Sequence, residues 1–153
     1  MKEFFNYLID KQITVATAES CTGGNIAAAF VAHPGISSVF LAGLVTYANS
    51  AKKHVLGVED TILKRNGAVS AECAAAMLKG AIRVTGAQAA VCTTGIAGPG
   101  GGSADKPVGL VYIGVCYQDV CTIQRCVFCG NRAEIIEKAK NEALFLLKWK
   151  VQK

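Results

Sequence analysis

A hydroxyl group in a turn between an expected strand and an expected helix is the first feature that could carry out chemistry. Ser20 stands in the run Thr17–Gly24, which reads Thr-Ala-Glu-Ser-Cys-Thr-Gly-Gly. The N-terminus of a helix presents free N–H groups and the positive end of the helix dipole, so it stabilises an oxygen that becomes negative. Gly23 and Gly24 permit a close approach of backbone or ligand. The alternative is that Ser20 or Thr22 only caps the helix, and the local pattern alone favours that simpler role.

A tyrosine and a lysine follow the next expected strand, in the run Thr46–Lys52. Because this strand ends near Tyr47 and a helix begins near Asn49, both side chains can project from one corner. A lysine that is shielded from water loses its preference for the charged form and can then serve as a base. The alternative is a solvated Lys52 beside Tyr47 at the edge of a sheet, which is the commoner situation for lysine.

A glycine-rich loop follows a third expected strand. The stretch Thr94–Ser103 contains five glycines and is followed by Asp105-Lys106-Pro107. The N–H groups of such a loop are left unpaired and can bind an anion. The loop is not a Walker motif, since no Gly-Lys-Ser/Thr ends it, and it lacks the helix-opening spacing of a dinucleotide fingerprint. The alternative is a merely flexible connection, but loops of this length are usually functional.

Cysteines and histidines offer weaker candidates. The seven cysteines are Cys21, Cys73, Cys92, Cys116, Cys121, Cys126 and Cys129. Their odd number and the lack of a secretory signal ahead of them favour reduced thiols in a cytoplasmic protein. Cys126 and Cys129 have the spacing of a metal or redox pair, but nothing completes a zinc site, so we expect buried or idle thiols and no metal. Neither His33 nor His54 stands where a Ser-His-Asp triad would place its base.

Composition favours a globular protein that binds a small molecule. Hydrophobic residues make up 52% and charged residues 18% of the sequence, which supplies a substantial core and excludes a disordered chain. The formal net charge is +5, but the basic residues are scattered except near the C-terminus. This diffuse charge disfavours nucleic-acid binding and suits a small anionic substrate. No apolar run reaches the ~18–20 residues of a membrane span, so no membrane partner is expected.

The apolar pattern predicts alternating strands and helices over a single domain, residues 1–153. The expected strands are 13–18, 39–47, 89–93, 108–117 and 120–128, and the expected helices are 3–11, 25–32, 49–56, 61–65, 71–84 and 132–149. This alternation favours a three-layer α/β domain, and the last two strands add an antiparallel hairpin to a mostly parallel, hence mixed, sheet. The carboxyl ends of parallel strands converge on one crevice, which would bring Ser20, Tyr47 and Thr94 together.

Four long motifs make the sequence similar to the C-terminal domain family of the competence/damage-inducible protein CinA, whose stand-alone members are known as nicotinamide-nucleotide amidases. The motifs are TAESCTGG at 17–24, GLVTYANSAKKHVLGV at 43–58, GAVS at 67–70 and TTGIAGPGGGSADKPVGLVYIG at 93–114. The resemblance implies a three-layer α/β/α sandwich around a mixed sheet. It also implies hydrolysis of nicotinamide mononucleotide, a pyridine nucleotide, to nicotinate mononucleotide and ammonia, without metal or organic cofactor. A homo-oligomer is expected by the same analogy.

The resemblance also implies roles for particular residues. Ser20 matches the nucleophile, Lys52 the base and Tyr47 its helper, while Arg132 matches a basic residue that holds the phosphate. The other expected substrate contacts are Cys21, Thr22, Gly23, Gly24, Thr94, Gly95, Gly98, Gly100 and Gly101. Family members commonly have a single small residue or proline where this chain has Cys126–Cys129, so the sequence departs from the family pattern just ahead of Arg132.

Together these residues suggest a Ser–Lys acyl-transfer mechanism. Neutral Lys52 would take the proton of Ser20 with the help of Tyr47, and Ser20 would attack the carboxamide carbon. N–H groups of the helix N-terminus and of the glycine loop would stabilise the oxyanion, by ~3–4 kcal/mol per well-aimed donor. One alternative is a non-catalytic nucleotide-binding module that uses the same loop and Arg132. Another is a nucleic-acid accessory protein, whose binding would fall steeply with salt.

Overall fold

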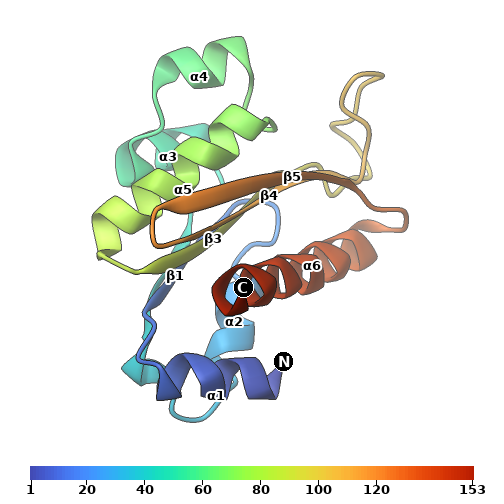
Figure 1. Cartoon of the computed structure of the whole chain (residues 1–153). Coiled ribbons are helices and arrows are strands. Elements are labelled where there is room, and N and C mark those ends of the chain that lie inside the picture. Colours follow the sequence, from blue (N-terminus) through green and yellow to red (C-terminus); the bar gives the residue numbers. More distant parts are fainter.

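The computed structural model describes all residues, 1–153, as a five-stranded sheet with helices on both faces (Figure 1). The helices are α1 (Lys2–Asp10), α2 (Asn25–Val31), α3 (Asn49–Leu56), α4 (Asp60–Arg65), α5 (Ala71–Thr85) and α6 (Arg132–Gln152), with a 3-10 helix η1 (Ile36–Ser38). The strands are β1 (Val15–Glu19), β2 (Phe40–Val45), β3 (Ala89–Gly95), β4 (Leu110–Tyr117) and β5 (Val120–Val127). The predicted order of elements is confirmed, and η1 is the one element without a counterpart in the prediction.

The sheet has the strand order β2-β1-β3-β4-β5. β1 runs parallel to both β2 and β3, whereas β4 pairs antiparallel with β3 and β5. Glu19, the last residue of β1, pairs with Val45 in β2 and with Thr93 in β3, so the three parallel strands end side by side. β1 and β3 are buried along almost their whole length, as expected for central parallel strands covered by helices on both faces. The predicted mixed sheet with an antiparallel hairpin is confirmed.

Helices cover the two faces of the sheet over two separate hydrophobic cores (Figure 1). α1, α2 and α6 lie on one face, where Phe4, Phe30 and Leu147 belong to the larger core. α3, α4 and α5 lie on the other face, where Leu56 and Met77 belong to the smaller core. The sheet between them completes the expected α/β/α sandwich. None of the helices has both the length and the apolar character needed to cross a membrane.

The hairpin of β4 and β5 contains a disulfide that was not expected from the sequence. Its two-residue turn consists of Gln118 and Asp119, both with positive φ, as tight hairpin turns require. This turn sets Cys116 directly opposite Cys121, with their Cα atoms 4.1 Å apart, and the two form a disulfide. The expectation that all seven thiols are reduced is therefore wrong for this pair, because the hairpin register brings their sulfur atoms together. The other five cysteines are free.

Candidate active site

The ends of β1 and β2 bring a serine hydroxyl and a lysine amine into contact. Ser20 directly follows β1, and Lys52 lies in α3, the helix that follows β2. Lys52 Nζ lies 2.9 Å from Ser20 Oγ. Both side chains are enclosed, since Ser20 is 8% exposed and Lys52 only 1%. A solvated lysine is thereby excluded, and the parallel pairing of β1 with β2 is what brings these two residues together.

The Lys52 amine is held by backbone carbonyl groups just ahead of its helix. It donates to the carbonyl oxygens of Thr46 at 2.8 Å and Tyr47 at 3.0 Å. It forms no ion pair, and burial lowers the pKa of Lys52 below its ordinary value. A neutral amine has two N–H donors and one lone pair, so with both donors on carbonyl groups the lone pair faces Ser20. The geometry therefore suits transfer of a proton from the serine to the lysine.

The turn that carries Ser20 is closed by glycines and by a link to β3. Gly23 and Gly24 adopt φ angles of 60° and 99°, which residues with side chains rarely adopt. The Thr22 hydroxyl lies 2.7 Å from that of Thr93, so the turn is tied to the neighbouring strand. The N-cap of α2 is Gly24 and has no side chain to cap with. The simpler role considered for the serine, capping this helix, is therefore not the one the structure shows.

A fully buried carboxylate at the end of β1 performs the capping instead, and prediction from the sequence missed it. Glu19 accepts five hydrogen bonds, all 2.7–3.3 Å long. The donors are the N–H groups of Gly24, Ile26 and Ala27 at the start of α2 and the hydroxyl groups of Thr17 and Thr22. A negative charge is favoured at this place because it faces the positive end of the helix dipole. The only sequence signal was an acidic residue at the end of an apolar strand, directly before the glycine-containing turn.

Glu19 changes which N–H groups are available beside the serine. The expectation that the helix N-terminus stabilises a negative oxygen is wrong for the N–H groups of the N-cap residue Gly24 and of Ile26 and Ala27 in α2, which already bind this carboxylate. The Gly23 N–H is also occupied, since it donates to the carbonyl of Ser20. The N–H groups of Cys21 and Thr22, which directly follow the serine, donate to no other residue of the chain. These two are the donors of the turn that remain available to an oxyanion.

The thiol next to the serine is poorly suited to compete as a nucleophile. Cys21 is buried, and burial raises the pKa of its thiol to about 11. At neutral pH the sulfur therefore keeps its proton, and a protonated thiol is a weak nucleophile. Ser20, with an amine at hydrogen-bond distance, is the better placed of the two.

Tyr47 offers its backbone, not its hydroxyl group, to the lysine. Its side chain is 58% exposed, and its hydroxyl oxygen accepts a hydrogen bond from Arg132 at 2.9 Å. No hydrogen bond joins the Tyr47 hydroxyl to Lys52 or Ser20, so the expected contact of this helper with the base is absent. Arg132 also donates to the carbonyl of Gly98 at 2.6 Å. Its guanidinium thus joins the corner after β2 to the glycine loop.

The glycine loop, residues 96–109, forms one wall of a cavity of about 560 Å³. The lining residues are Ala97, Pro99 and Val108 of the loop and Gly130, Asn131, Arg132, Ala133 and Ile136 around the start of α6. A cavity of this size suits a small-molecule ligand. Arg132 is its one charged side chain, and the same guanidinium donates to the Tyr47 hydroxyl. Ser20 and Lys52 are not among the residues that line this cavity.

None of the remaining predicted residues of the loop lines this cavity. Thr94 and Gly95 belong to β3, and the Thr94 hydroxyl donates to the carbonyl of Ala68 at 2.7 Å. At 1% exposure Thr94 is a buried support of the loop. Gly100 and Gly101 are exposed and are not among the cavity's lining residues.

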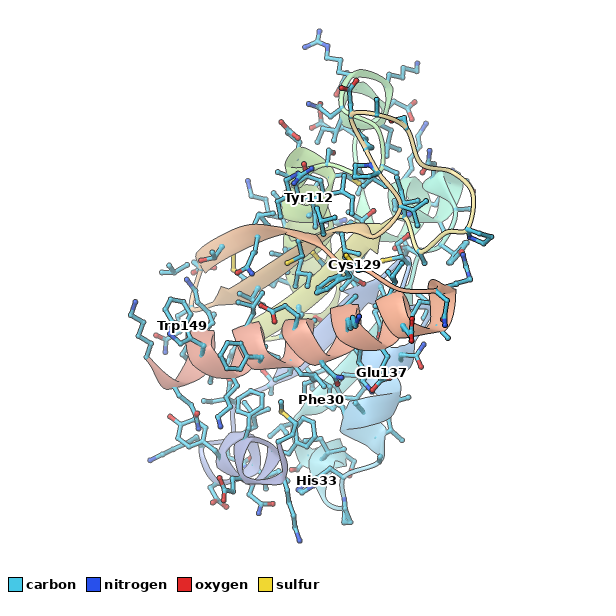
Figure 2. The ribbon with its side chains drawn as sticks, turned by 90° about the vertical axis from the view of Figure 1, so that its right-hand side faces the viewer. Phe30, His33, Tyr112, Cys129, Glu137 and Trp149 are labelled. Atoms are coloured by element: carbon cyan, nitrogen blue, oxygen red, sulfur yellow. A yellow bond between two sulfur atoms is a disulfide. The ribbon has the colours of Figure 1, made fainter.

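The histidines and the Cys126–Cys129 pair lie outside the site. Figure 2 shows His33 at the end of the molecule formed by α1 and α2, opposite the glycine loop, and its ring bonds to Asn6. His54 is exposed in the last turn of α3. Cys126 is half-buried, Cys129 is exposed, and no group of three or more His, Cys, Asp or Glu side chains is arranged to hold a metal ion. A serine–lysine pair, and not a serine–histidine pair, is what the fold assembles.

The fold and the site define an α/β protein with a buried serine–lysine pair beside the carboxyl ends of parallel strands. The model of the CinA C-terminal domain matches residues 1–151, and the chain belongs to this family. A competence-damage inducible protein of Clostridium beijerinckii is 50% identical over 141 residues, and one of Moorella thermoacetica is 47% identical over 140 residues. Each alignment covers 92% of the chain but only 34% of the relative, so the chain spans about a third of the length of these proteins.

Solved structures share the whole fold. Competence damage-inducible protein A of Klebsiella pneumoniae superposes with a TM-score of 0.93 at 34% identity, covering 99% of this chain and 96% of that chain. Competence/damage inducible protein CihA of Agrobacterium tumefaciens superposes with a TM-score of 0.90 at 41% identity, covering 95% of this chain and 92% of that chain. At these identities the similarity extends to the family and is not limited to the arrangement of strands.

Proposed function

We propose that the chain is an amide hydrolase that converts nicotinamide mononucleotide and water into nicotinate mononucleotide and ammonia. The observation that carries the proposal is the 2.9 Å contact between Ser20 Oγ and the buried amine of Lys52, whose other two partners are carbonyl oxygens. Membership of the CinA C-terminal domain family supports the choice of substrate. A module that only binds nucleotides has no need of a buried amine beside a hydroxyl group, so this pair favours catalysis.

In the first half of the reaction, Ser20 becomes acylated. Neutral Lys52 takes the hydroxyl proton while Ser20 Oγ forms a bond to the carboxamide carbon, and the carbonyl oxygen of the substrate becomes an oxyanion. The free N–H groups of Cys21 and Thr22 donate to this oxyanion, at ~3–4 kcal/mol for each well-aimed donor. Lys52, now an ammonium, passes its proton to the amide nitrogen. The carbon–nitrogen bond breaks, and ammonia leaves.

In the second half, water releases the acid. Lys52 is neutral again after ammonia has left, so it can take a proton from a water molecule that attacks the acyl carbon. The second oxyanion uses the same two N–H groups, and its collapse returns the proton to Ser20 Oγ. While Lys52 carries the proton, the carbonyl groups of Thr46 and Tyr47 accept two of its three N–H bonds, which stabilises the transient charge.

Arg132 and the glycine loop supply the binding of the phosphate. In the structure the guanidinium donates to two neutral acceptors, the Gly98 carbonyl and the Tyr47 hydroxyl. A phosphate is a stronger acceptor because it is charged and can take two parallel N–H bonds. Arg132 lines the cavity of about 560 Å³, so a nucleotide seated there brings its phosphate within reach of this side chain.

Ammonia release from nicotinamide mononucleotide by Ser20→Ala and Ser50→Ala variants tests the proposal. Ser50 is a matched control, because it is an exposed serine of α3 without a role in the site. Ser20→Ala should lower turnover by a factor of ~10³ or more, since nucleophile and base act as one unit, while circular dichroism stays unchanged. Near-normal turnover in Ser20→Ala would contradict the proposal. Nucleotide binding without ammonia release by the wild type would favour the non-catalytic module.

A further inference from the structure

We propose that Glu19 is a positioning residue for the reaction: its carboxylate fixes the turn that aims Ser20 at Lys52 and keeps two N–H groups free for the oxyanion. This inference rests on the proposed function, because it assigns a role within the same site. Glu19 forms no hydrogen bond with the Lys52 amine and acts through the backbone of the turn that it encloses.

Hydrogen bonds between the Glu19 carboxylate and the start of α2 close a ring of backbone that contains the nucleophile, Ser20. Glu19 ends β1, and its Oε2 accepts from the N–H groups of Gly24 at 3.0 Å and Ile26 at 3.1 Å, while Oε1 accepts from Ala27 at 2.8 Å. The chain between this carboxylate and these N–H groups is the turn that contains Ser20. A cap on the N-cap residue itself would hold only the helix, whereas a cap that begins five residues earlier holds the whole turn.

The ring decides which N–H groups remain for catalysis. Each N–H group that donates to Glu19 is lost to any other acceptor, and these lie at the far end of the turn from the serine. The N–H groups of Cys21 and Thr22, the two residues that directly follow Ser20, donate to no other residue of the chain. If the carboxylate were removed, the released N–H groups and the loosened turn would no longer aim two donors at one point. A misaimed oxyanion donor costs ~10²- to 10³-fold in turnover.

The same residue ties the turn to the strands on either side. The Thr22 hydroxyl donates to Glu19 Oε2 at 2.7 Å, so its oxygen is left to accept from the Thr93 hydroxyl of β3. On the other side, the backbone carbonyl of Glu19 accepts from the N–H of Thr46, whose own carbonyl holds the Lys52 amine. Glu19 therefore links the nucleophile and the base through one hydrogen-bonded network.

Only an acceptor can fill this place. All five groups around the carboxylate are donors toward it, and no cation contacts it. A glutamine of the same shape would turn an NH₂ group toward N–H donors, which breaks contacts on one of the two oxygen positions. Aspartate keeps both oxygens but is shorter by one methylene group, so it can meet only part of the set.

The test compares Glu19→Gln, Glu19→Asp and Thr22→Val with Ser70→Ala. The control removes a helix cap of similar type, since the Ser70 hydroxyl accepts from the Cys73 N–H at the start of α5, but it lies outside the reaction. Two quantities are measured well below each variant's melting temperature. One is kcat and KM for ammonia release from nicotinamide mononucleotide. The other is the rate at which a fluorophosphonate labels Ser20, followed by intact mass, which does not depend on the natural substrate.

Positioning predicts a specific pattern. Glu19→Gln should lose ~10²-fold or more in kcat with KM nearly unchanged, and its labelling rate should fall in parallel. Glu19→Asp should recover part of both, and Ser70→Ala should keep both despite a lower melting temperature. Should Glu19→Gln fail to fold, Thr22→Val removes one donor to the carboxylate and should lower kcat about 10-fold, as expected for one hydrogen bond to a charged group.

Two results overturn the inference. One is a folded Glu19→Gln with kcat and labelling rate close to those of the wild type. The other, where that variant does not fold, is Thr22→Val with unchanged kcat and labelling. A wild-type chain that is labelled at Ser20 but releases no ammonia would refute the proposed substrate, and the labelling rates of the variants would still decide the role of Glu19.

Discussion

Replacing Lys52 by methionine is the perturbation with the most definite expected outcome. Methionine has a similar length and no charge, so it can occupy the apolar path of the buried side chain while it removes the amine. The amine has three partners at 2.8–3.0 Å: the Ser20 hydroxyl and the carbonyl groups of Thr46 and Tyr47. The variant therefore deletes the base and leaves two carbonyl oxygens without a donor, while the nucleophile stays in place.

The magnitude follows from these contacts. A positioned general base contributes ~10²- to 10⁴-fold, and the loss of turnover should lie at the upper end because no other base contacts Ser20. At about 1.4 kcal/mol per factor of ten, this loss corresponds to ~3–5 kcal/mol of the activation barrier. Stability should change less: each orphaned carbonyl costs ~1–3 kcal/mol, but the burial of an ammonium or neutral amine no longer opposes folding.

A double-mutant cycle measures whether Ser20 and Lys52 act together in catalysis. Ammonia release is measured for Lys52→Met, Ser20→Ala and the double variant, with Lys53→Met as the matched control. Lys53 neighbours Lys52 in sequence but is exposed and pairs with Asp60 at 2.7 Å, and such a solvent-exposed ion pair contributes little to stability. Because nucleophile and base act as one unit, the double variant should be no slower than the slower single variant. Losses that multiply in the double variant would show that Ser20 and Lys52 act independently, and wild-type turnover in Lys52→Met would show that Lys52 is not the base.

Three further outcomes are expected. Burial lowers the pKa of Lys52, and the reaction needs the neutral amine. Therefore kcat/KM should fall about tenfold per pH unit as the pH drops below that pKa, and a pH–rate profile without this acid limb would contradict the role of Lys52 as the base. Arg132→Ala should raise KM for nicotinamide mononucleotide roughly 10- to 150-fold, because hydrogen bonds to a charged group are lost. KM for the phosphate-free nucleoside should not change, and equal effects on both substrates would argue against phosphate binding by Arg132. Cys116→Ser with Cys121→Ser should lower the free energy of unfolding by about 2 kcal/mol in urea titrations and leave turnover intact, and a reductant should destabilise the wild type alone.

Much of the fold could be predicted because local and global signals agree along this chain. Ser70 and Gly86 mark the ends of α5, and the structure shows the Ser70 hydroxyl as the cap and Gly86 with positive φ. The buried strands read as short apolar runs, and their alternation with helices makes β1, β2 and β3 parallel. From that topology alone, the positions after these strands converge, which is why Ser20 and the corner that leads to Lys52 could be paired without coordinates.

What could not be predicted depends on side-chain direction and on pairing register. The Tyr47 hydroxyl turns to Arg132, a residue 85 positions away, and no local pattern reports such a contact. Glu19 ends a buried strand, and the cost of burying its carboxylate is offset only when N–H groups at the start of α2 donate to it. The disulfide could have been predicted from the sequence, because a two-residue turn at Gln118-Asp119 sets Cys116 opposite Cys121.

In the proposed mechanism, Ser20 is acylated with the buried amine of Lys52 as the base. Rapid quenching of the wild type with nicotinamide mononucleotide, followed by peptide mass spectrometry, detects the acyl enzyme itself. We expect the peptide containing Ser20 to gain the mass of the substrate less ammonia, and Lys52→Met not to accumulate this adduct. Ammonia release at full rate with Ser20 unmodified at every quench time, and with normal turnover in Ser20→Ala, would contradict it.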